Sequence, residues 1–425
     1  MKSSLYNIHV KGNDYTLVFN TFTSSFVKLN STIANKIEDN NFDDIPQDLI
    51  TKLKTQGIIV DDVKSQLMQY KYLFYEASFG NQKPFLYIAP TMQCNFACEY
   101  CFEKDNKNQG LMDDDIIHSI VKFLKAYGKE DIYIVWFGGE PMLGFSSIIT
   151  LCDELHKSDI KYSSSMITNG SLFNSRNIYQ LEKLNLNFIQ FSMDGIGDTQ
   201  DSRRFFKGGK PSFEIIITNL KELLKKTNIP IVIQITIDHN NLSAYEDTLK
   251  YCNEHFSKHI ETKRLQIGVN HVQDRTGFDS GKVCLTADEI IMSGIDDINS
   301  SKNWIIPQLN FPCMFRSSWH FAIDPEGNVY KCLEHLGDRQ KRVGSLREDW
   351  ISLERIARAA LEEDAFQNDE CIKCKVFPIC GGGCPLDRIA GSKNIKSKKD
   401  ICSKYKYGLE RMLPYVYESV YNNKM

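Results

Sequence analysis

Apolar and polar positions follow two different periods along this chain. Between residues 84 and 271, short apolar runs that predict strands are separated by stretches with an apolar residue every three or four positions, which is typical of amphipathic helices. The predicted strands cover 85–90, 132–137, 162–168, 188–193, 231–237 and 265–271. The predicted helices cover 113–127, 146–157, 175–184, 213–225 and 244–256, with Gly128 closing the first. This alternation predicts an α/β fold, a partial (β/α)6 TIM-like barrel.

Residues 1–60 carry a different pattern and predict a separate small unit. Three β-type runs predict a hairpin plus one strand; they lie at 5–10, 15–20 and 25–29. Ser31 is expected to cap a first helix, Gln47 to Gln56 is expected to form a second helix that ends at Gly57, and residues 58–60 return as a strand.

Two further segments complete the expected organisation. Residues 61–83 predict a linker with a helical portion, and residues 403–424 predict a capping helix, because their apolar residues recur at helical spacing. A chain of 425 residues is long enough for two or three units, each with its own core. We expect domains at 1–60, 84–290 and 291–425.

Composition and charge narrow the class of protein. The hydrophobic content of 42% is ordinary for a globular chain, and a formal net charge of −3 gives no reason to expect nucleic acid or an anionic membrane as partner. No run of apolar residues is long enough for a transmembrane helix, and the N-terminal apolar run is too short for a signal peptide. We expect a cytoplasmic protein.

Thirteen cysteines in a cytoplasmic chain predict metal ligands, catalytic thiols or small buried side chains rather than disulfides. Three lie within residues 94–101 and seven within 313–402. Of the remaining three, Cys152 and Cys252 fall at helical spacing among apolar residues, so we expect them to be buried. Cys284 is the third.

The segment Cys94-Asn-Phe-Ala-Cys98-Glu-Tyr-Cys101 directly follows the first predicted barrel strand. Thiolates select zinc or iron–sulfur clusters, and three of them leave one metal position without a protein ligand. Polar motifs close the next three strands: Gly138-Gly139-Glu140, Thr168-Asn169-Gly170 and Ser192-Met193-Asp194-Gly195. Because the carboxyl ends of parallel strands share one edge, all four segments are expected to face one cavity.

The CxxxCxxC spacing, with Tyr100 before the last cysteine, resembles the signature of the radical S-adenosylmethionine (SAM) enzymes. The resemblance implies that Cys94, Cys98 and Cys101 hold a [4Fe–4S] cluster whose unique iron is chelated by SAM. Reduction of such a cluster cleaves SAM and yields a 5′-deoxyadenosyl radical, which abstracts hydrogen from a substrate.

The same resemblance implies contacts to SAM. Gly138 and Gly139, with Glu140, would hold the methionine amino group. Ser192 and Asp194 would lie near the ribose or carboxylate, Tyr100 near the adenine, and Asn169 in the same cavity. Arg204 would pair with the methionine carboxylate, although the His that the family usually has before Asp201 is Gln200 here.

The C-terminal cysteines resemble the SPASM domain, an extension of peptide-modifying radical SAM enzymes that holds two auxiliary clusters. Implied ligands of the outer cluster are Cys371, Cys374, Cys380 and Cys402, and those of the inner one Cys313, Cys332 and Cys384. A zinc ribbon competes for the two cysteine pairs within 371–384, but it leaves Cys313, Cys332 and Cys402 unexplained. In total, three [4Fe–4S] clusters are implied.

The inner set lacks a fourth cysteine in residues 305–312, where some relatives place it. Either an iron is left open, which would suit a substrate thiolate, or Cys284 supplies the ligand.

Together these resemblances imply a radical SAM maturase that forms a thioether or carbon–carbon crosslink in a ribosomally made precursor peptide. Residues 1–60 are similar to the winged-helix-like element that binds a leader peptide by strand addition in such enzymes. The implied partners are that precursor peptide with its leader and a flavodoxin- or ferredoxin-type reductant.

Three alternatives stay open. An anaerobic sulfatase-maturing enzyme makes formylglycine, but such enzymes lack the N-terminal unit and usually have Asp where this chain has Leu333. A peptide epimerase would need a thiol hydrogen donor such as Cys284. An electron-transfer or peptide-binding protein without radical turnover is disfavoured by the open-site motif and its neighbouring Gly-Gly-Glu.

Overall fold

The structure is a computed structural model that describes residues 1–80, 83–101, 103, 110–126, 131–272, 284–285, 289, 313–392, 402 and 405–421. The chain divides into two compact units. The first comprises Met1–Asn81, Leu285–Ser317 and Ala360–Met425, and the second Gln82–Cys284 and Ser318–Ala359. The division cuts across the boundary expected at residue 290, because part of the C-terminal region extends the sheet of the second unit.

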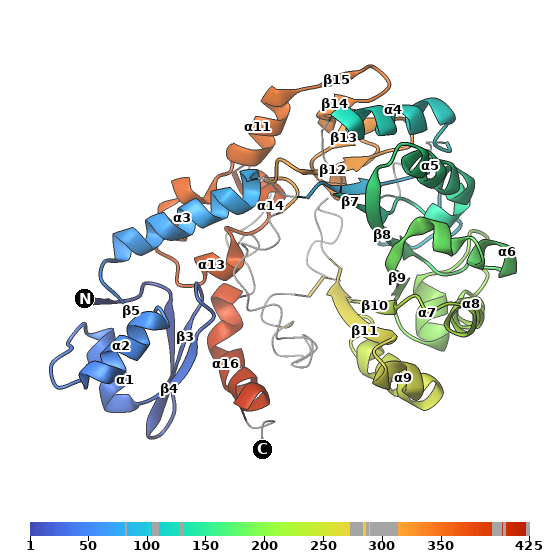
Figure 1. Cartoon of the computed structure of the whole chain (residues 1–425). Helices are drawn as coiled ribbons and strands as arrows, with labels where there is room; N and C mark the ends of the chain where they lie inside the picture. Colours follow the sequence, from blue (N-terminus) through green and yellow to red (C-terminus); the bar gives the residue numbers. More distant parts are fainter. Residues whose placement is uncertain are drawn as a thin grey trace. The chain divides into compact units, whose positions relative to one another are not determined.

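The second unit is built on the predicted parallel sheet (Figure 1). Its six strands are β6 (Phe85–Ile88), β7 (Asp131–Trp136), β8 (Lys161–Thr168), β9 (Leu186–Met193), β10 (Ile231–Ile237) and β11 (Leu265–His271). They neighbour one another in chain order and all pair in parallel, which confirms the predicted α/β class. Their carboxyl ends therefore share one edge.

The sequence pattern did not predict how this sheet continues beyond β6. Strand β12 (His320–Ile323) pairs with β6 in parallel, and three antiparallel strands follow it. These are β13 (Asn328–Tyr330), β14 (Gly344–Ser345) and β15 (Trp350–Ile351). Strands of two or three residues carry too little periodicity to be recognised, so only the tertiary pairing defines them.

Helices line one side of the parallel strands (Figure 1). They are α4 (Asp114–Ala126), α5 (Phe145–Lys157), α6 (Ser175–Ile178), α7 (Gly197–Arg203), α8 (Phe213–Lys226) and α9 (Ala244–Glu261). Turns of 3-10 helix add η2 (Pro141–Gly144), η3 (Leu181–Leu184), η5 (Leu333–His335) and η6 (Arg339–Lys341), and α11 (Leu353–Leu361) follows β15. The expected end of α4 at Gly128 lies outside the described residues.

One helix prediction was wrong in detail. The expected helix over residues 175–184 is split into α6 and η3. Leu181 and Leu184 are both buried, and in a 3-10 turn residues three apart lie on the same face, so this geometry buries both.

The core of the second unit lies between the sheet and these helices. Strand β10 shows the pattern clearly: Ile231, Ile233, Ile235 and Ile237 are fully buried, whereas the residues between them are only half-buried. The opposite face of the sheet carries polar side chains such as Gln234.

The first unit begins with the predicted antiparallel strands. Strands β2 (Asn7–Lys11), β3 (Tyr15–Asn20) and β4 (Phe26–Asn30) form a sheet in that order, while the short strands β1 (Lys2–Ser3) and β5 (Ile59–Val60) pair with each other. Helices α1 (Ser31–Glu38) and α2 (Gln47–Thr55) are confirmed.

The N-cap of α1 corrects the prediction by one residue. Asn30, not Ser31, is the capping residue, and its side chain accepts a hydrogen bond from the N–H of Thr32. Gly57 adopts a left-handed φ of +73° just after α2, as expected for a residue that ends a helix.

Residues 61–83, expected to be a linker with a helical portion, contain the long helix α3 (Val63–Phe79), whose Tyr70 and Phe74 are part of a buried cluster. Tyr70 is fully buried, and its ring contacts Phe366 and Phe377. The C-terminal elements around it are η7 (Ala365–Gln367), α12 (Asp369–Ile372), α13 (Phe377–Cys380), α14 (Pro385–Ser392) and α16 (Tyr405–Tyr421).

The N-terminal sheet contributes to two buried clusters. In the first, Val18 of β3 and Leu29 of β4 pack with residues of α1 and α2, so residues 1–60 have a core of their own. Ile8 and Phe19 form one buried cluster with Leu409 and Leu413 of α16, which confirms the predicted C-terminal helix. Residues 1–60 therefore share a second buried cluster with the C-terminal segment. Among the described residues, no helix is both long and apolar enough to cross a bilayer.

Candidate functional site

The thiols of the 94–101 segment lie in the loop after β6, and each is half-buried. The N–H of Phe96 donates to Cys94 Sγ at 3.4 Å, and the N–H of Cys101 donates to the carbonyl of Cys98 at 3.3 Å. Within the described part of the chain, no three His, Cys, Asp or Glu side chains gather around a single metal position. An iron–sulfur cluster does not need three side chains around one metal position, because each of its thiolates binds a different iron. Three half-buried thiols in one loop fit such a cluster.

Gly138 and Gly139 hold this loop by close backbone approach. Gly138 has a φ of +110°, and a Cβ added to it would lie 2.4 Å from the carbonyl oxygen of Thr91. A Cβ on Gly139 would lie 2.3 Å from the carbonyl oxygen of Met92. The N–H of Glu140 donates to the carbonyl of Gln93 at 2.8 Å. The two glycines are thus required for contact with the protein's own cysteine loop, whatever ligand binds beside them.

Glu140 is fully buried and joins the ends of two strands. One carboxylate oxygen accepts from the N–H of Met142 at 3.0 Å and from the Thr168 hydroxyl at 2.8 Å, and the other accepts from the N–H of Asn169 at 2.8 Å. Burial raises the pKa of this carboxyl, against the opposing effect of these donors. A carboxylate has about four acceptor positions, so one is left for the amino group predicted to bind here.

Asn169 links the end of β8 to the cysteine loop. Its amide nitrogen donates to the side-chain oxygen of Asn95 at 2.8 Å and lies 3.9 Å from Cys94 Sγ. Its amide oxygen accepts from the N–H and the hydroxyl of Ser171, at 2.9 and 2.6 Å. Donors to a ligating sulfur are among the groups that tune a cluster, so Asn169 would act on a cluster held by Cys94.

Asp194, at the end of β9, is the centre of a buried charge network. Its carboxylate accepts from the hydroxyl of Tyr100 at 2.6 Å, from Nε of Arg203 at 2.8 Å and from Nη1 of Arg204 at 3.4 Å. Arg203 also makes a two-pronged ion pair with Asp238, at 3.1 and 2.7 Å. Two cations and two anions therefore balance each other in a nearly water-free site.

Arg204 has spare capacity for an anion. Its Nη1 donates to the hydroxyl of Tyr100 at 2.6 Å, but its buried Nε has no hydrogen-bond partner. Leaving such a donor unpaired costs about 1–3 kcal/mol. The carboxylate predicted to pair with Arg204 would remove that cost. Tyr100, expected beside the adenine, has the added role of fixing Arg204 and Asp194.

Ser192 lies one residue before Met193 on β9 and is half-buried. It faces away from the buried side chains of Phe191 and Met193, since side chains alternate along a strand. Within the described residues it is not part of the network around Asp194. Its predicted role near the ribose stays a prediction.

Sequence reasoning missed several residues of this site. Asp238 follows β10 directly, so the rule that strand ends share one edge could have found it. Gln200 is fully buried and accepts from the N–H of Asp194 at 2.8 Å, so the residue that departs from the family pattern positions the central carboxylate. The side chain of Asn241 donates to the carbonyl of Asp194 at 2.7 Å.

Four of the C-terminal cysteines gather within the first unit. Cys371 and Cys374 border one buried apolar cluster, Cys374 and Cys380 border another, and Cys402 precedes the first residue of α16 by three positions. Cys313 and Cys384 belong to the same unit, whereas Cys332 belongs to the other. The two predicted ligand sets stay predictions, and the segment 305–312 lies outside the described residues.

The isolated thiols behave as expected. Cys152 and Cys252 are buried in α5 and α9, and burial raises the pKa of each thiol to about 12. A thiol that stays protonated is a poor nucleophile and a poor ligand, which confirms the structural role predicted for both.

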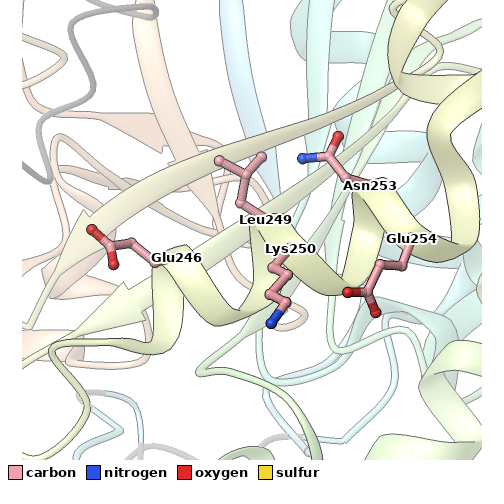
Figure 2. Close-up of a pocket in the computed structure, with 5 residues that line it drawn as sticks. All are labelled: Glu246, Leu249, Lys250, Asn253 and Glu254. Carbon is pink, nitrogen blue, oxygen red and sulfur yellow. The ribbon is translucent and has the colours of Figure 1, made fainter.

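A shallow pocket elsewhere contains none of these residues. It lies along α9 and is lined by Glu246, Leu249, Lys250, Asn253 and Glu254 (Figure 2). All five residues lie on one helix at helical spacing, so the pocket is a groove on the surface of α9. None of the predicted site residues lines it.

The first strand of the parallel sheet ends in a loop with three thiols, and an arginine with an unpaired Nε and a buried carboxylate follow other strands of the same sheet. This arrangement fits an enzyme that binds SAM at an open iron–sulfur cluster. Residues 88–252 match the family described as the radical SAM superfamily. The chain therefore contains a radical SAM domain, and the relatives that it resembles are enzymes. The superfamily of that domain uses SAM and a [4Fe–4S] cluster.

Relatives match far more than this domain. The radical SAM cyclopropyl synthase TigE of Paramaledivibacter caminithermalis is 22% identical, over 86% of this chain and 82% of its own. A serine-type anaerobic sulfatase-maturating enzyme of Klebsiella aerogenes is 24% identical, over 71% and 79%.

Two solved structures share the fold. The structure of anSMEcpe with bound AdoMet has a TM-score of 0.61 at 23% identity, covering 80% of this chain and 100% of its own. Streptococcus suis SuiB bound to its precursor peptide SuiA has a TM-score of 0.54 at 15% identity, covering 95% and 98%.

Proposed function

We propose that this enzyme is a maturase that forms a thioether or carbon–carbon crosslink in a ribosomally made precursor peptide. The observation that carries the proposal is the N-terminal sheet with an open edge strand, in a chain whose full-length structural match is SuiB with its precursor peptide. SAM and its cluster supply a 5′-deoxyadenosyl radical when bound.

The chain's own residues would prepare the site for that chemistry. Cys94, Cys98 and Cys101 would hold the SAM-binding cluster, and the glycines after β7 would keep their loop in place. Arg204 would hold the methionine carboxylate through its unpaired Nε, and the last acceptor position of Glu140 would hold the amino group. Tyr100 and Asp194 would keep Arg204 in position.

Chain coverage separates the two kinds of relative. The anSMEcpe structure matches along its whole length yet leaves about a fifth of this chain uncovered, whereas SuiB covers 95%. The wider coverage by SuiB, which was solved with its precursor peptide, supports a precursor peptide as substrate.

Strand β4 is the edge that we expect the leader to join. The N–H of Asn20 donates to the carbonyl of Ser25, and the N–H of Ser31 to that of Asp14. In an antiparallel pair of strands, hydrogen-bonded and non-hydrogen-bonded residue pairs alternate. Counted from these two bonds, Lys28 and its partner Leu17 form a non-hydrogen-bonded pair, so the backbone N–H and C=O of Lys28 point away from β3. Lys28 is exposed, whereas the first two residues of β2, at the other edge, are buried. Strand addition therefore favours β4.

Two proline substitutions test the edge. Lys28→Pro removes an outward N–H at β4 while leaving the β3–β4 bonds intact, and Lys11→Pro does the same at β2. The probe is a fluorescently labelled synthetic peptide with the sequence of any short reading frame found beside the gene, and binding is measured by fluorescence anisotropy. We expect Lys28→Pro to weaken binding at least tenfold and Lys11→Pro to leave it unchanged. Equal affinities for both variants would refute strand addition at β4.

The second candidate function is formylglycine formation, because sulfatase-maturating enzymes are among the relatives. The mass and reactivity of the product distinguish it from crosslink formation. A crosslinked peptide loses two hydrogen atoms and gives linked fragments in tandem mass spectrometry. A formylglycine product reacts with a hydrazide instead, and such labelling of a sulfatase-derived peptide would replace our proposal.

We further propose three [4Fe–4S] clusters and a flavodoxin- or ferredoxin-type reductant. The triple substitution of Cys94, Cys98 and Cys101 by Ala should abolish 5′-deoxyadenosine formation from SAM and lower bound iron by about a third. Retained 5′-deoxyadenosine formation would refute the assignment of the SAM-binding cluster. Reduced flavodoxin should support turnover in place of dithionite.

A further inference from the structure

The loop between Cys380 and Cys384 has an unusual backbone. Gly381, Gly382 and Gly383 all adopt left-handed φ values, of +58°, +85° and +74°. A Cβ on Gly382 would lie 2.2 Å from that of Ala365. Only glycine tolerates three such residues in succession, so the loop has a defined path that presents its carbonyl groups to neighbouring side chains.

Those carbonyl groups bind two arginines. Nη1 of Arg316 donates to the carbonyls of Gly381 and Gly383, at 3.0 and 3.2 Å, and Nε of Arg388 donates to that of Gly382. The loop thus fixes two guanidinium groups beside the cysteines that flank it.

Arg316 is a buried cation in need of an anion. It is 5% exposed, its Nη2 has no hydrogen-bond partner, and the described residues provide no carboxylate that forms an ion pair with it. A buried charge without a partner costs several kcal/mol. Burial lowers the pKa of this guanidinium, while the nearby thiols of Cys313, Cys380 and Cys384 act in the opposite direction. As thiolates on a cluster, these residues would supply the missing negative charge.

Two more cations contact cysteine sulfurs directly. Nη2 of Arg388 lies 2.8 Å from Cys371 Sγ, and Nζ of Lys406 lies 3.5 Å from Cys402 Sγ. Cys371 and Cys402 are ligands of the same predicted outer cluster. Two cationic side chains from separate segments therefore donate to sulfurs of one predicted set, whereas Arg316 lies near cysteines of both predicted sets.

We propose that Arg388 and Lys406 raise the reduction potential of the outer auxiliary cluster and so make it an electron acceptor. The inference rests on the proposed function. Closing a crosslink between a substrate carbon radical and a thiol releases one proton and one electron, and the cluster takes that electron. Its charge then becomes more negative by one, and neighbouring cations stabilise the reduced form most.

The experiment is a reductive titration followed by electron paramagnetic resonance, on anaerobically reconstituted protein that carries the triple alanine substitution at residues 94, 98 and 101. Only auxiliary clusters contribute to that signal. We expect Arg388→Gln and Lys406→Gln each to shift the midpoint potential of one cluster to lower values, with an additive shift in the double variant. Arg388→Lys keeps the charge and should retain most of the wild-type potential.

A matched control separates local from general charge effects. Lys52→Gln removes a positive charge from exposed α2 of the same unit, and should leave both midpoints unchanged. Midpoints that do not move in Arg388→Gln and Lys406→Gln, or that move equally in Lys52→Gln, would overturn the inference. If the Arg388→Gln variant does not bind iron, the midpoint potential of the Lys406→Gln variant is the test of the inference.

The iron content of the triple alanine variant distinguishes failure of the proposed auxiliary clusters from failure of the role proposed for the cations. If the triple variant binds no iron, the auxiliary clusters of the proposed function are wrong, and this inference falls with them. If it binds iron and no variant shifts a midpoint, only the role of these cations is wrong.

Discussion

Replacing Asp194 by Asn would test the buried charge network most directly. The substitution keeps the shape of the side chain but removes a fully buried negative charge that faces Arg203 and Arg204. Coulomb's law at an effective dielectric of about 20 gives roughly 6 kcal/mol for the 2.8 Å contact with Arg203 and roughly 5 kcal/mol for the 3.4 Å contact with Arg204. Desolvation of the charged groups offsets much of this attraction.

Removing one partner of a buried ion pair costs about 3–5 kcal/mol in free energy of unfolding. Asp238 still compensates Arg203 in the variant, so we expect the lower end, about 3 kcal/mol. The measurement is urea unfolding of the iron-free chain by circular dichroism with linear extrapolation. Asp198→Asn, on the exposed first turn of α7, is the control and should change stability by less than about 0.5 kcal/mol.

A double-mutant cycle with Arg203→Met isolates the contact itself. We expect a coupling energy of about 2 kcal/mol between residues 194 and 203, because their charge-assisted hydrogen bond is buried. A coupling near zero, or a loss in Asp194→Asn no larger than in Asp198→Asn, would show that the network does not stabilise the fold.

Two further predictions concern the cysteine loop and pH. Gly139→Ala places a methyl group against the backbone of Met92 and Gln93, so it should lower the melting temperature and the amount of iron bound by the loop. Gly110→Ala, whose added methyl group meets no atom within 4 Å, is the control and should change neither. An unchanged melting temperature and iron content in Gly139→Ala would contradict the close approach. Burial and the charge of Lys331 lower the pKa of His320 to about 4, so the unfolded chain takes up this proton first as the pH falls. Stability should therefore drop between about pH 6.5 and 4, by at most about 3 kcal/mol from this group. His320→Phe should flatten that part of the pH profile, and an unchanged profile would contradict it.

Much of the fold was accessible from the sequence because its signals are local. The six parallel strands and most helices of the second unit have strong periodicity, and β10 and β11 were predicted with their exact bounds. The helical portion predicted within residues 61–83 is α3, but its burial was not predicted, because α3 also exposes Met68, Tyr72 and Phe79 and so lacks the one-sided pattern of a surface helix. Its buried face packs on Phe366 and Phe377, about 300 residues away.

For the site, the sequence by itself determined which groups are present: three thiols in one loop, and glycines and carboxylates where parallel strands end. Spacing along the chain sets these, since strand ends share an edge in any parallel sheet. Only the tertiary structure decided the partners: Asp238 for Arg203, Gln200 for the backbone of Asp194, and the cysteine loop for Gly138 and Gly139. Such pairs depend on three-dimensional approach within about 3 Å, which no local pattern encodes.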